Sequence, residues 1–378
     1  MSMRFLFASD SFKGSLSSEA VGKIMTEAAR EIFPDCVCKN IITADGGEGT
    51  IQAIKAAKGG EYVNVKVKDP FFRDITAKYL VCDDCAVISV AEAIGLTLLK
   101  NDERDPLKAS SYGAGQLIAD AIDRGYKKIC IALGGSATCD GGIGALTALG
   151  VEFFAENGDV CKGVGEELIK IRNVSLKNCH DFNDIKFTLL CDVNNTLLGV
   201  SGACFTFAPQ KGADRKTVQQ LEDGMQNFAK VVQRRFNCVT DFEGGGAAGG
   251  LGFALKVFLK AEIESGINYI LRLNNFDDEV LNADCVFSGE GKIDGQTGGG
   301  KVVSGIAKRC KKFNKPLICI VGCVGDDAEP LYDTGVTAIF SIINKPMDLS
   351  QSIENATELY SAAAKNIFRV LKTNMFVR

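Results

Sequence analysis

The sequence predicts an α/β protein of two domains, in which the two chain ends build one wound domain around an inserted domain with a mixed sheet. Three observations predict this. The chain of 378 residues exceeds the usual single-domain range. Strand-like apolar runs alternate with helix-like segments near both ends. Between them, residues 61–90 alternate apolar and polar side chains in antiparallel style.

The amino-terminal segment predicts a strand, a helix and a second strand. Residues 4–9 form an apolar run, residues 17–32 have helical periodicity with Ser17 or Ser18 as N-cap, and residues 39–43 form the next strand. Two strands joined by a helix predict a parallel sheet.

The middle of the chain changes pattern and then returns to alternation. Val63, Val65 and Val67 alternate with polar residues, and Asp83-Asp84 predicts a hairpin turn before the strand at 86–90. Further elements are expected as a helix at 113–124, a strand at 128–133, a helix at 143–149, a strand at 187–190 and a helix at 214–236.

The last hundred residues alternate cleanly between strands and helices. Strands are expected at 283–288, 317–322 and 336–342, with helices at 301–312 and 352–371. Because both ends have wound α/β patterns, we expect residues 1–68 and 268–378 to form one domain and residues 69–267 to form the inserted one.

Composition excludes several classes of function. The net charge of −4 argues against non-specific nucleic-acid binding, and no apolar run approaches the length of a membrane span. A single histidine, His180, excludes most zinc-hydrolase ligand sets. Most of the fifteen cysteines lie in apolar runs, and residues 1–8 are too short for a signal peptide, so we expect reduced thiols in the cytoplasm.

Three loops combine glycines with carboxylates, at residues 44–50, 134–142 and 288–297. Each follows an apolar run and precedes a helix-like stretch. Glycines let backbone N–H groups approach an anion, and carboxylates suit Mg²⁺ or proton transfer. Together they are typical of phosphoryl transfer.

The third loop comes close to a P-loop. Residues 295–301 have the G-x-x-x-x-G-K spacing, but Val302 stands where the Mg²⁺-binding hydroxyl residue belongs. An ordinary P-loop NTPase is therefore disfavoured. Either this is a glycine turn that begins a helix, or Lys301 serves a phosphate site whose metal is held elsewhere.

Two further segments place polar side chains after expected strands. Lys13, in the Ser/Gly-rich turn 9–15, either binds phosphate as a point charge or is a solvated lysine beside an N-cap. Asp192, after the strand at 187–190, is either a base, a metal ligand or an ordinary turn residue.

Several stretches together closely resemble the bacterial glycerate kinase family, whose members begin with D-S-F-K-G-S. The matching stretches are 10–17, 44–50, 111–115, 134–138, 191–194, 209–213, 246–252 and 289–291. Four positions depart from the family pattern: Ser9 and Asn195 replace Pro, Cys139 replaces Asn, and Lys292 replaces Arg.

The resemblance implies two α/β domains, one of them flavodoxin-like, with the active site in the cleft between them. It implies an enzyme that uses ATP to phosphorylate D-glycerate, giving 2-phosphoglycerate more than 3-phosphoglycerate. The partners expected are these small molecules, with no nucleic acid and no membrane, and a homodimer is the assembly considered.

Candidate site residues follow from the motifs and the resemblance together. Asp192 and Lys13 are expected to be catalytic. Substrate and phosphate are expected to contact Asp10, Ser11, Ser136, Thr138, Lys211, Gly289, Lys292 and Lys301. Mg²⁺ is expected at Asp45, Glu48, Glu290 and Asp294, and which acid is base and which is ligand stays open.

Two alternatives to a glycerate kinase remain. A phosphatase or phosphomutase would carry D-x-D-x-[TV] after a strand, and the chain has no such motif. A non-catalytic sensor of a small phosphorylated acid would use the same anion-binding loops without turnover.

Overall fold

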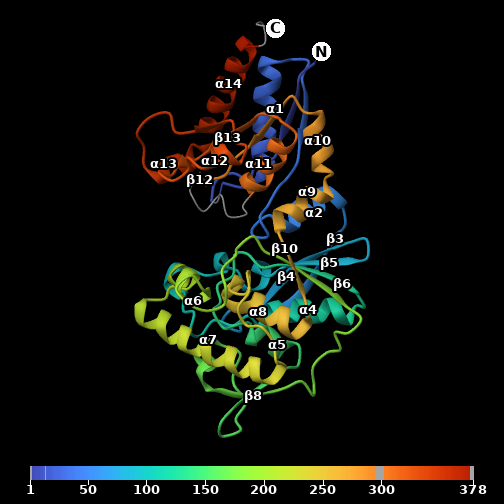
Figure 1. The fold of residues 1–378 in the computed structure, drawn as a ribbon, viewed down its shortest axis with the longest axis vertical. Helices are drawn as coiled ribbons and strands as arrows, with labels where there is room; N and C mark the ends of the chain where they lie inside the picture. The colour runs from blue at the N-terminus through green and yellow to red at the C-terminus, as the bar shows by residue number, and fades with distance from the viewer. Residues whose placement is uncertain (1, 13, 294–301, 375–378) are drawn as a thin grey trace. The chain divides into compact units, whose positions relative to one another are not determined.

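The computed structural model describes residues 2–12, 14–293 and 302–374 (Figure 1). The chain forms two compact units. Unit 1 contains residues 1–45, 52–58 and 265–378, and unit 2 contains residues 46–51 and 59–264. The chain therefore leaves unit 1 at residue 46, returns briefly for one helix, and leaves again until residue 265.

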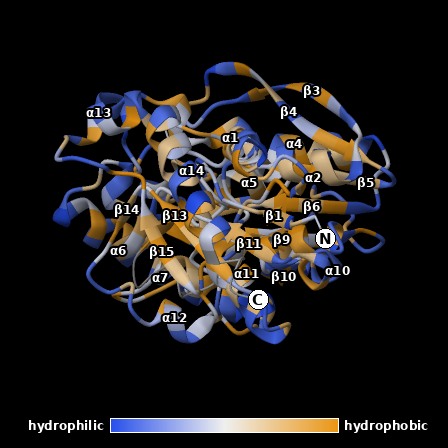
Figure 2. Cartoon of the chain, turned by 90° about the horizontal axis from the view of Figure 1, so that it is seen from above, coloured by the Kyte–Doolittle hydropathy of each residue, from blue (hydrophilic) through white to orange (hydrophobic). Residues whose placement is uncertain are grey.

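Unit 1 is built on a five-stranded parallel sheet of order β15-β13-β11-β1-β2. Its strands are β1 (Arg4–Phe7), β2 (Val37–Asn40), β11 (Cys285–Ser288), β13 (Leu317–Val321) and β15 (Ala338–Ser341). Counted in chain order within the unit, this is the 2-1-3-4-5 order of flavodoxin-like sheets. The expected flavodoxin-like domain is confirmed, and its central strands are hydrophobic (Figure 2).

Helices cover both faces of this sheet because successive strand residues point to opposite sides. Phe5 and Phe7 of β1 pack with α1 (Ser18–Ile32) and α14 (Ala356–Asn374), whereas Leu6 packs on the opposite face. The opposite face is covered by α9 (Gly266–Leu273), α10 (Phe276–Asn282) and α11 (Val302–Lys312). Ser17 is the N-cap of α1, as expected, and its side chain accepts a hydrogen bond from the N–H of Ala20.

The smaller elements of unit 1 complete its outline. They are α2 (Thr50–Lys58), α12 (Leu331–Thr334), α13 (Leu349–Glu354) and the short strand pair β12 (Lys292–Ile293) and β14 (Cys323–Val324). The helix expected at 352–371 is two helices, since α13 ends at its C-cap Asn355 before α14 begins. A capping box between Asp348 and Gln351 begins α13.

Unit 2 contains a six-stranded mixed sheet of order β10-β9-β6-β5-β4-β3. Its strands are β3 (Glu61–Lys68), β4 (Asp74–Cys82), β5 (Cys85–Ser89), β6 (Lys128–Ala132), β9 (Lys186–Leu190) and β10 (Glu262–Glu264). The expected hairpin at Asp83-Asp84 joins β4 to β5. Residues 61–68, expected in the first domain, pair with β4 along their whole length and so belong to unit 2.

The helices of unit 2 pack against this sheet around one large core. They are α3 (Ala91–Ile94), α4 (Tyr112–Asp123), α5 (Ile143–Ala148), α6 (Ala203–Phe207), α7 (Arg215–Phe236) and α8 (Ala247–Leu259), with short 3-10 turns at 96–98, 101–103, 165–170 and 209–211. A separate antiparallel pair joins β7 (Glu152–Ala155) to β8 (Ile171–Ser175). The long helix expected at 214–236 is confirmed, with Asp214 as its N-cap.

Within the described part of the chain, no helix is both long enough and apolar enough to cross a membrane. The fifteen cysteines all lie among the described residues, form no disulfide, and are mostly buried. Cys139, one of the departures from the family pattern, is fully buried in the core of unit 2. Its thiol therefore packs as a small apolar group.

Candidate functional site

In unit 1, the carboxyl ends of β1 and β11 form the point where the strand order reverses, which is where open α/β sheets bind ligands. The segment Ser9–Ser11 follows β1, and Gly289–Gly291 follows β11. The two segments are joined by a 2.8 Å hydrogen bond from the N–H of Asp10 to the carbonyl oxygen of Gly289. The sequence-predicted residues Asp10, Ser11 and Gly289 therefore lie together.

Three hydroxyl groups, two of them buried, hold the segment after β1 in place. The carbonyl oxygen of Ser9 accepts hydrogen bonds from Ser18 Oγ at 2.6 Å and Thr43 Oγ1 at 2.8 Å. On the neighbouring strand, Ser288 Oγ donates to the carbonyl oxygen of Ala8 at 2.8 Å. A Cβ at Gly289 would lie 1.8 Å from the carbonyl oxygen of Ile320, so this turn requires glycine.

Two buried acidic residues belong to this edge of unit 1. Asp10 is 8% exposed and Glu290 is 9% exposed, and each follows the end of a different, neighbouring strand. The backbone N–H of Ser11 donates to Asp10 Oδ1 at 2.7 Å. Mg²⁺ in phosphoryl-transfer sites is held by one or two carboxylates together with phosphate oxygens, so the donor chemistry here fits that ion.

Of four further predicted site residues of unit 1, the structure describes one and leaves three outside the described ranges. Lys292 lies on β12 with an exposed side chain. Lys13, Asp294 and Lys301 lie outside the described residues, and their roles stay predictions. No group of three or more His, Cys, Asp or Glu side chains in metal-binding geometry occurs among the residues that the structure describes.

In unit 2, the first and second glycine loops pack against each other. The N–H of Gly134 donates to the carbonyl oxygen of Gly46 at 3.0 Å, and a Cβ at Gly134 would lie 2.3 Å from the Cα of Gly47. A Cβ at Gly46 would lie 2.8 Å from the carbonyl oxygen of Leu190, the last residue of β9. Asp192 lies two residues after Leu190 and is half-buried.

The acids of the first loop differ in exposure. Asp45 is half-buried and Glu48 is exposed, and both lie between β2 and α2 where the chain passes from unit 1 to unit 2. Their expected role as metal ligands stays a prediction.

Asp140 fixes the shape of the second loop, a role that the sequence did not reveal. Its carboxylate is fully buried and accepts four hydrogen bonds: from the N–H and Oγ of Ser111 at 2.7 Å each, and from the N–H groups of Gly142 at 3.1 Å and Gly144 at 3.2 Å. Burial raises the pKa of Asp140, and these hydrogen bonds oppose that rise. The carboxylate is thus fully used in holding the loop.

Lys211 provides a buried cation against this loop. Its side chain is 3% exposed, and its ammonium group donates to Ser136 Oγ at 3.1 Å and to the carbonyl oxygen of Thr138 at 2.7 Å. No carboxylate of the described residues forms an ion pair with it. The fold therefore brings together three residues that the sequence predicted. Lys211 lies 75 positions after Ser136 and 73 positions after Thr138 in the chain.

Further polar groups around Lys211 have no partner among the described residues. These are Thr138 Oγ1, which is fully buried, and Arg104 Nε. Arg104 Nη1 contacts the carbonyl oxygen of Gln210 at 3.3 Å, directly before Lys211 in the chain. Arg104 was missed at the sequence level because nothing in its local pattern distinguishes it from a solvated arginine.

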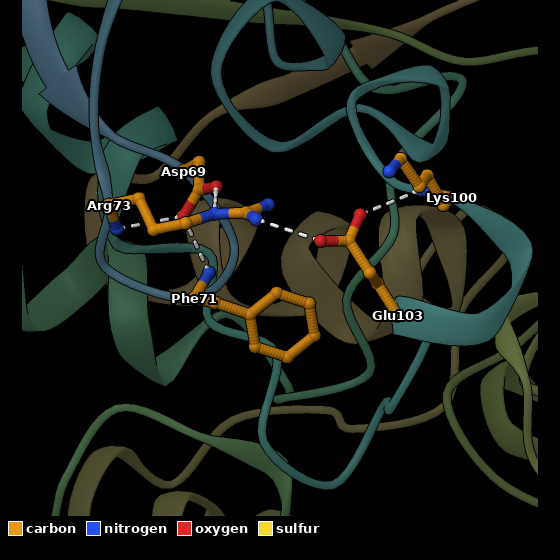
Figure 3. Close-up of polar contacts among 5 residues, drawn as sticks. All are labelled: Asp69, Phe71, Arg73, Lys100 and Glu103. Carbon is orange, nitrogen blue, oxygen red and sulfur yellow. Dashed lines mark hydrogen bonds and ion pairs between the residues drawn. The ribbon is translucent and has the colours of Figure 1, made fainter.

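A network of charges holds the segment that carries Arg104 (Figure 3). The carboxylate of Asp69, 2% exposed, accepts from the backbone N–H groups of Phe71 at 2.8 Å and Arg73 at 2.9 Å and pairs with the Arg73 guanidinium. Arg73 Nη1 then donates to Glu103 Oε1 at 3.0 Å. The N–H of Lys100 and the ion pair with Arg73 lower the pKa of Glu103, the residue before Arg104.

Glycines of α8 close the other side of the second loop. Ala248, Gly249 and Gly250 all have left-handed backbone angles, and the N–H of Gly141 donates to the carbonyl oxygen of Gly249 at 3.0 Å. A Cβ at Gly249 would lie 2.0 Å from the carbonyl oxygen of Thr138, the acceptor of the Lys211 hydrogen bond. Tight backbone packing therefore sets the position of that carbonyl.

The sequence and the fold were compared with those of known proteins. The model of the glycerate kinase family matches residues 5–372. The chain belongs to the glycerate kinase family. The resemblance predicted from the sequence is confirmed, and with it the expectation of a kinase enzyme.

Relatives in the glycerate kinase family match over nearly the full length. The glycerate kinase of Halalkalibacterium halodurans is 37% identical, over 98% of this chain and 98% of its own. The glycerate 2-kinase of Escherichia coli K12 is 36% identical, over 99% of both chains. A crystal structure of a putative glycerate kinase 2 from Salmonella typhimurium LT2 is 35% identical, covers 100% of both chains and has a TM-score of 0.83.

Proposed function

We propose that this chain transfers a phosphoryl group from ATP to the C2 hydroxyl of D-glycerate, with Mg²⁺, and releases 2-phosphoglycerate. Family membership supports phosphorylation of glycerate, and the name of the Escherichia coli relative supports the 2-position. The structural observation that carries the proposal is the buried ammonium group of Lys211. It donates hydrogen bonds to two groups and forms no ion pair with a carboxylate of the described residues. A buried cation in that state fits an anionic ligand.

Glu290 of unit 1 is the first proposed ligand for the metal. Glu290 follows β11 at the point where the strand order reverses, and its low exposure fits a carboxylate that binds a cation. Asp45, Glu48 and Asp294 are the other proposed ligands. These carboxylates would hold Mg²⁺, which would supply positive charge against the phosphates. Asp10, Ser11, Gly289, Lys292 and Lys301 are proposed to contact substrate or phosphate, with Lys13 as a charge clamp.

Asp192 is the proposed acceptor of the proton from the hydroxyl nucleophile. It lies two residues after β9, whose last residue, Leu190, packs against Gly46 of the first glycine loop. The sheet therefore gives it a rigid support. His180, the sole histidine, contacts the carbonyl oxygen of Leu149 at 3.1 Å and lies 3.4 Å from Asp123, so its ring nitrogens serve that corner of unit 2. A carboxylate is therefore the base that the chain offers.

Phosphorus NMR of the reaction with D-glycerate and MgATP tests the proposal in one measurement. The expected result is ADP together with a phosphomonoester resonance that matches 2-phosphoglycerate. A resonance of 3-phosphoglycerate would contradict the proposed position. Absence of any product, combined with thermal stabilisation by phosphoglycerate, would replace the kinase with a non-catalytic sensor.

A further inference from the structure

Lys211 and the hydroxyl groups next to it include hydrogen-bond donors whose protons have no acceptor among the described residues. An ammonium group carries three N–H bonds, and two of those of Lys211 go to Ser136 Oγ and the carbonyl oxygen of Thr138. Because Ser136 Oγ accepts from Lys211, its own O–H remains a donor. Thr138 Oγ1 and Arg104 Nε have no partner among the described residues.

A ligand that fits this set must be an acceptor without protons of its own. An ionised carboxylate has that chemistry, since its two oxygens offer about four lone-pair positions and no donor. Burial strengthens the case, because Ser136, Thr138 and Lys211 are each at most 6% exposed. A buried ammonium group and a buried carboxylate compensate each other's loss of hydration when they are hydrogen-bonded together.

Phosphate fits the same place less well. The transferring phosphate of a kinase carries Mg²⁺, which needs a carboxylate ligand. The acid in this loop is Asp140, and its carboxylate already accepts hydrogen bonds from Ser111, Gly142 and Gly144. Among the described groups that hydrogen-bond to Lys211, a hydroxyl and a backbone carbonyl, there is therefore no carboxylate that could also hold the metal.

We propose that Lys211, Ser136 and Thr138, with Arg104 beside them, form the subsite for the carboxylate of the substrate and make the enzyme selective for 2-hydroxy acids over neutral polyols. This assignment rests on the proposed function. A carboxylate fixed here places the adjacent C2 hydroxyl at a constant distance from the subsite. Glycerol, which lacks the carboxylate, would leave Lys211 buried without its anion.

Steady-state kinetics of Lys211→Met distinguish a carboxylate subsite from a phosphate subsite. Methionine has a similar length and no charge. The carboxylate keeps its charge throughout the reaction, so its contacts bind ground state and transition state equally. The KM for D-glycerate should rise roughly 10- to 100-fold, the usual effect of losing a charged hydrogen bond, with kcat and the KM for ATP nearly unchanged.

Selectivity provides a second readout that a purely structural lysine would not change. In the wild type, kcat/KM for D-glycerate should greatly exceed that for glycerol. In Lys211→Met this preference should fall by the same factor as the affinity for glycerate. The matched control is Lys216→Met, an exposed lysine of α7 that should leave both values unchanged.

Three outcomes would overturn the proposal. A fall in kcat with an unchanged KM for D-glycerate would assign Lys211 to the transferring phosphate. Unchanged kinetics would reduce it to a support for the Thr138 carbonyl. If Lys211→Met does not fold, Ser136→Ala takes its place, and an unchanged KM for D-glycerate there would also contradict the subsite.

Failure of the proposed function would be recognised separately. If the wild type shows no turnover of D-glycerate with MgATP, the kinase assignment fails. Calorimetric titration with D-glycerate then still tests the subsite, because wild type should bind the acid and Lys211→Met should bind it at least about 10-fold more weakly. Equal binding by the two proteins would refute the subsite.

Discussion

Replacing Gly249 with alanine is a sharp test of how the second loop is positioned. Gly249 is buried, has a φ of +67°, and its absent Cβ would lie 2.0 Å from the carbonyl oxygen of Thr138 and 2.7 Å from the Cα of Cys139. Both neighbouring atoms belong to the backbone, so no side-chain rotation can relieve the contact. Gly158 is the matched control, with a φ of +86° and nothing within 4 Å of its Cβ position.

The two variants separate backbone strain from steric overlap. Alanine in the left-handed region costs about 1–2 kcal/mol, and both variants incur that cost. Gly249→Ala adds an overlap that forces a backbone shift, which typically costs about 1–3 kcal/mol more. The free energy of unfolding should therefore fall by about 2–5 kcal/mol in Gly249→Ala and by about 1–2 kcal/mol in Gly158→Ala.

Urea unfolding followed by circular dichroism measures these losses, and kinetics with D-glycerate provide the second readout. Because the Thr138 carbonyl accepts the hydrogen bond from Lys211, its displacement should raise the KM for D-glycerate in Gly249→Ala. Gly158→Ala should retain wild-type kinetics. Equal stability losses in the two variants, or a normal KM in Gly249→Ala, would refute the idea that this contact positions the lysine.

Three further substitutions test other parts of the structure. Asp192→Asn should keep the melting temperature and lower kcat by roughly 10²–10⁴-fold, and near-normal turnover would move the base to another acid. Asp140→Ala removes the acceptor of four buried donors and should cost at least about 3 kcal/mol in urea unfolding; a loss below about 1 kcal/mol would contradict its structural role. The N–H of Thr217 lowers the pKa of Asp214 in the folded state, so its share of stability is present above the unfolded pKa of about 3.9 and is lost as the pH falls through the folded value. Asp214→Asn keeps a capping residue without that titration, so its melting temperature should fall less between about pH 5 and pH 2, and an identical fall would refute the effect.

Local features of the fold were predictable because they depend on short-range chemistry. Ser17 caps α1, the helix over Arg215–Phe236 was expected within one residue, and the turn between β4 and β5 was expected at Asp83-Asp84. The structure differs from the prediction where contacts with residues distant in the sequence determine the local structure. Residues 61–68 join unit 2 because β4 pairs with them, and α8 contains left-handed residues that no helical periodicity indicates.

The candidate site was predictable in its parts and not in its connections. Ser136, Thr138 and Lys211 were each identified from sequence, but the hydrogen bonds among them join residues more than seventy positions apart. Arg104 and Asp140 were missed for the same reason. A buried carboxylate that supports a loop and one that binds a metal look alike in sequence, because the difference lies in which donors surround them.

The pairing of β1 with β11 has a consequence for synthesis on the ribosome. Phe5 lies opposite Cys285 in the sheet, so unit 1 cannot assemble its central pair until three quarters of the chain has been made. At about 5–20 residues per second, β1 waits roughly 15–60 s for β11, whereas β2, its partner on the other side, is complete once residue 40 has been made. During that time the sheet of unit 2, which ends at Glu264, is already complete in sequence. Until then Phe5 and Phe7 can pack against α1 but lack Phe287 and Phe368, the later part of their core, so the amino-terminal segment keeps exposed apolar surface of the kind that chaperones bind.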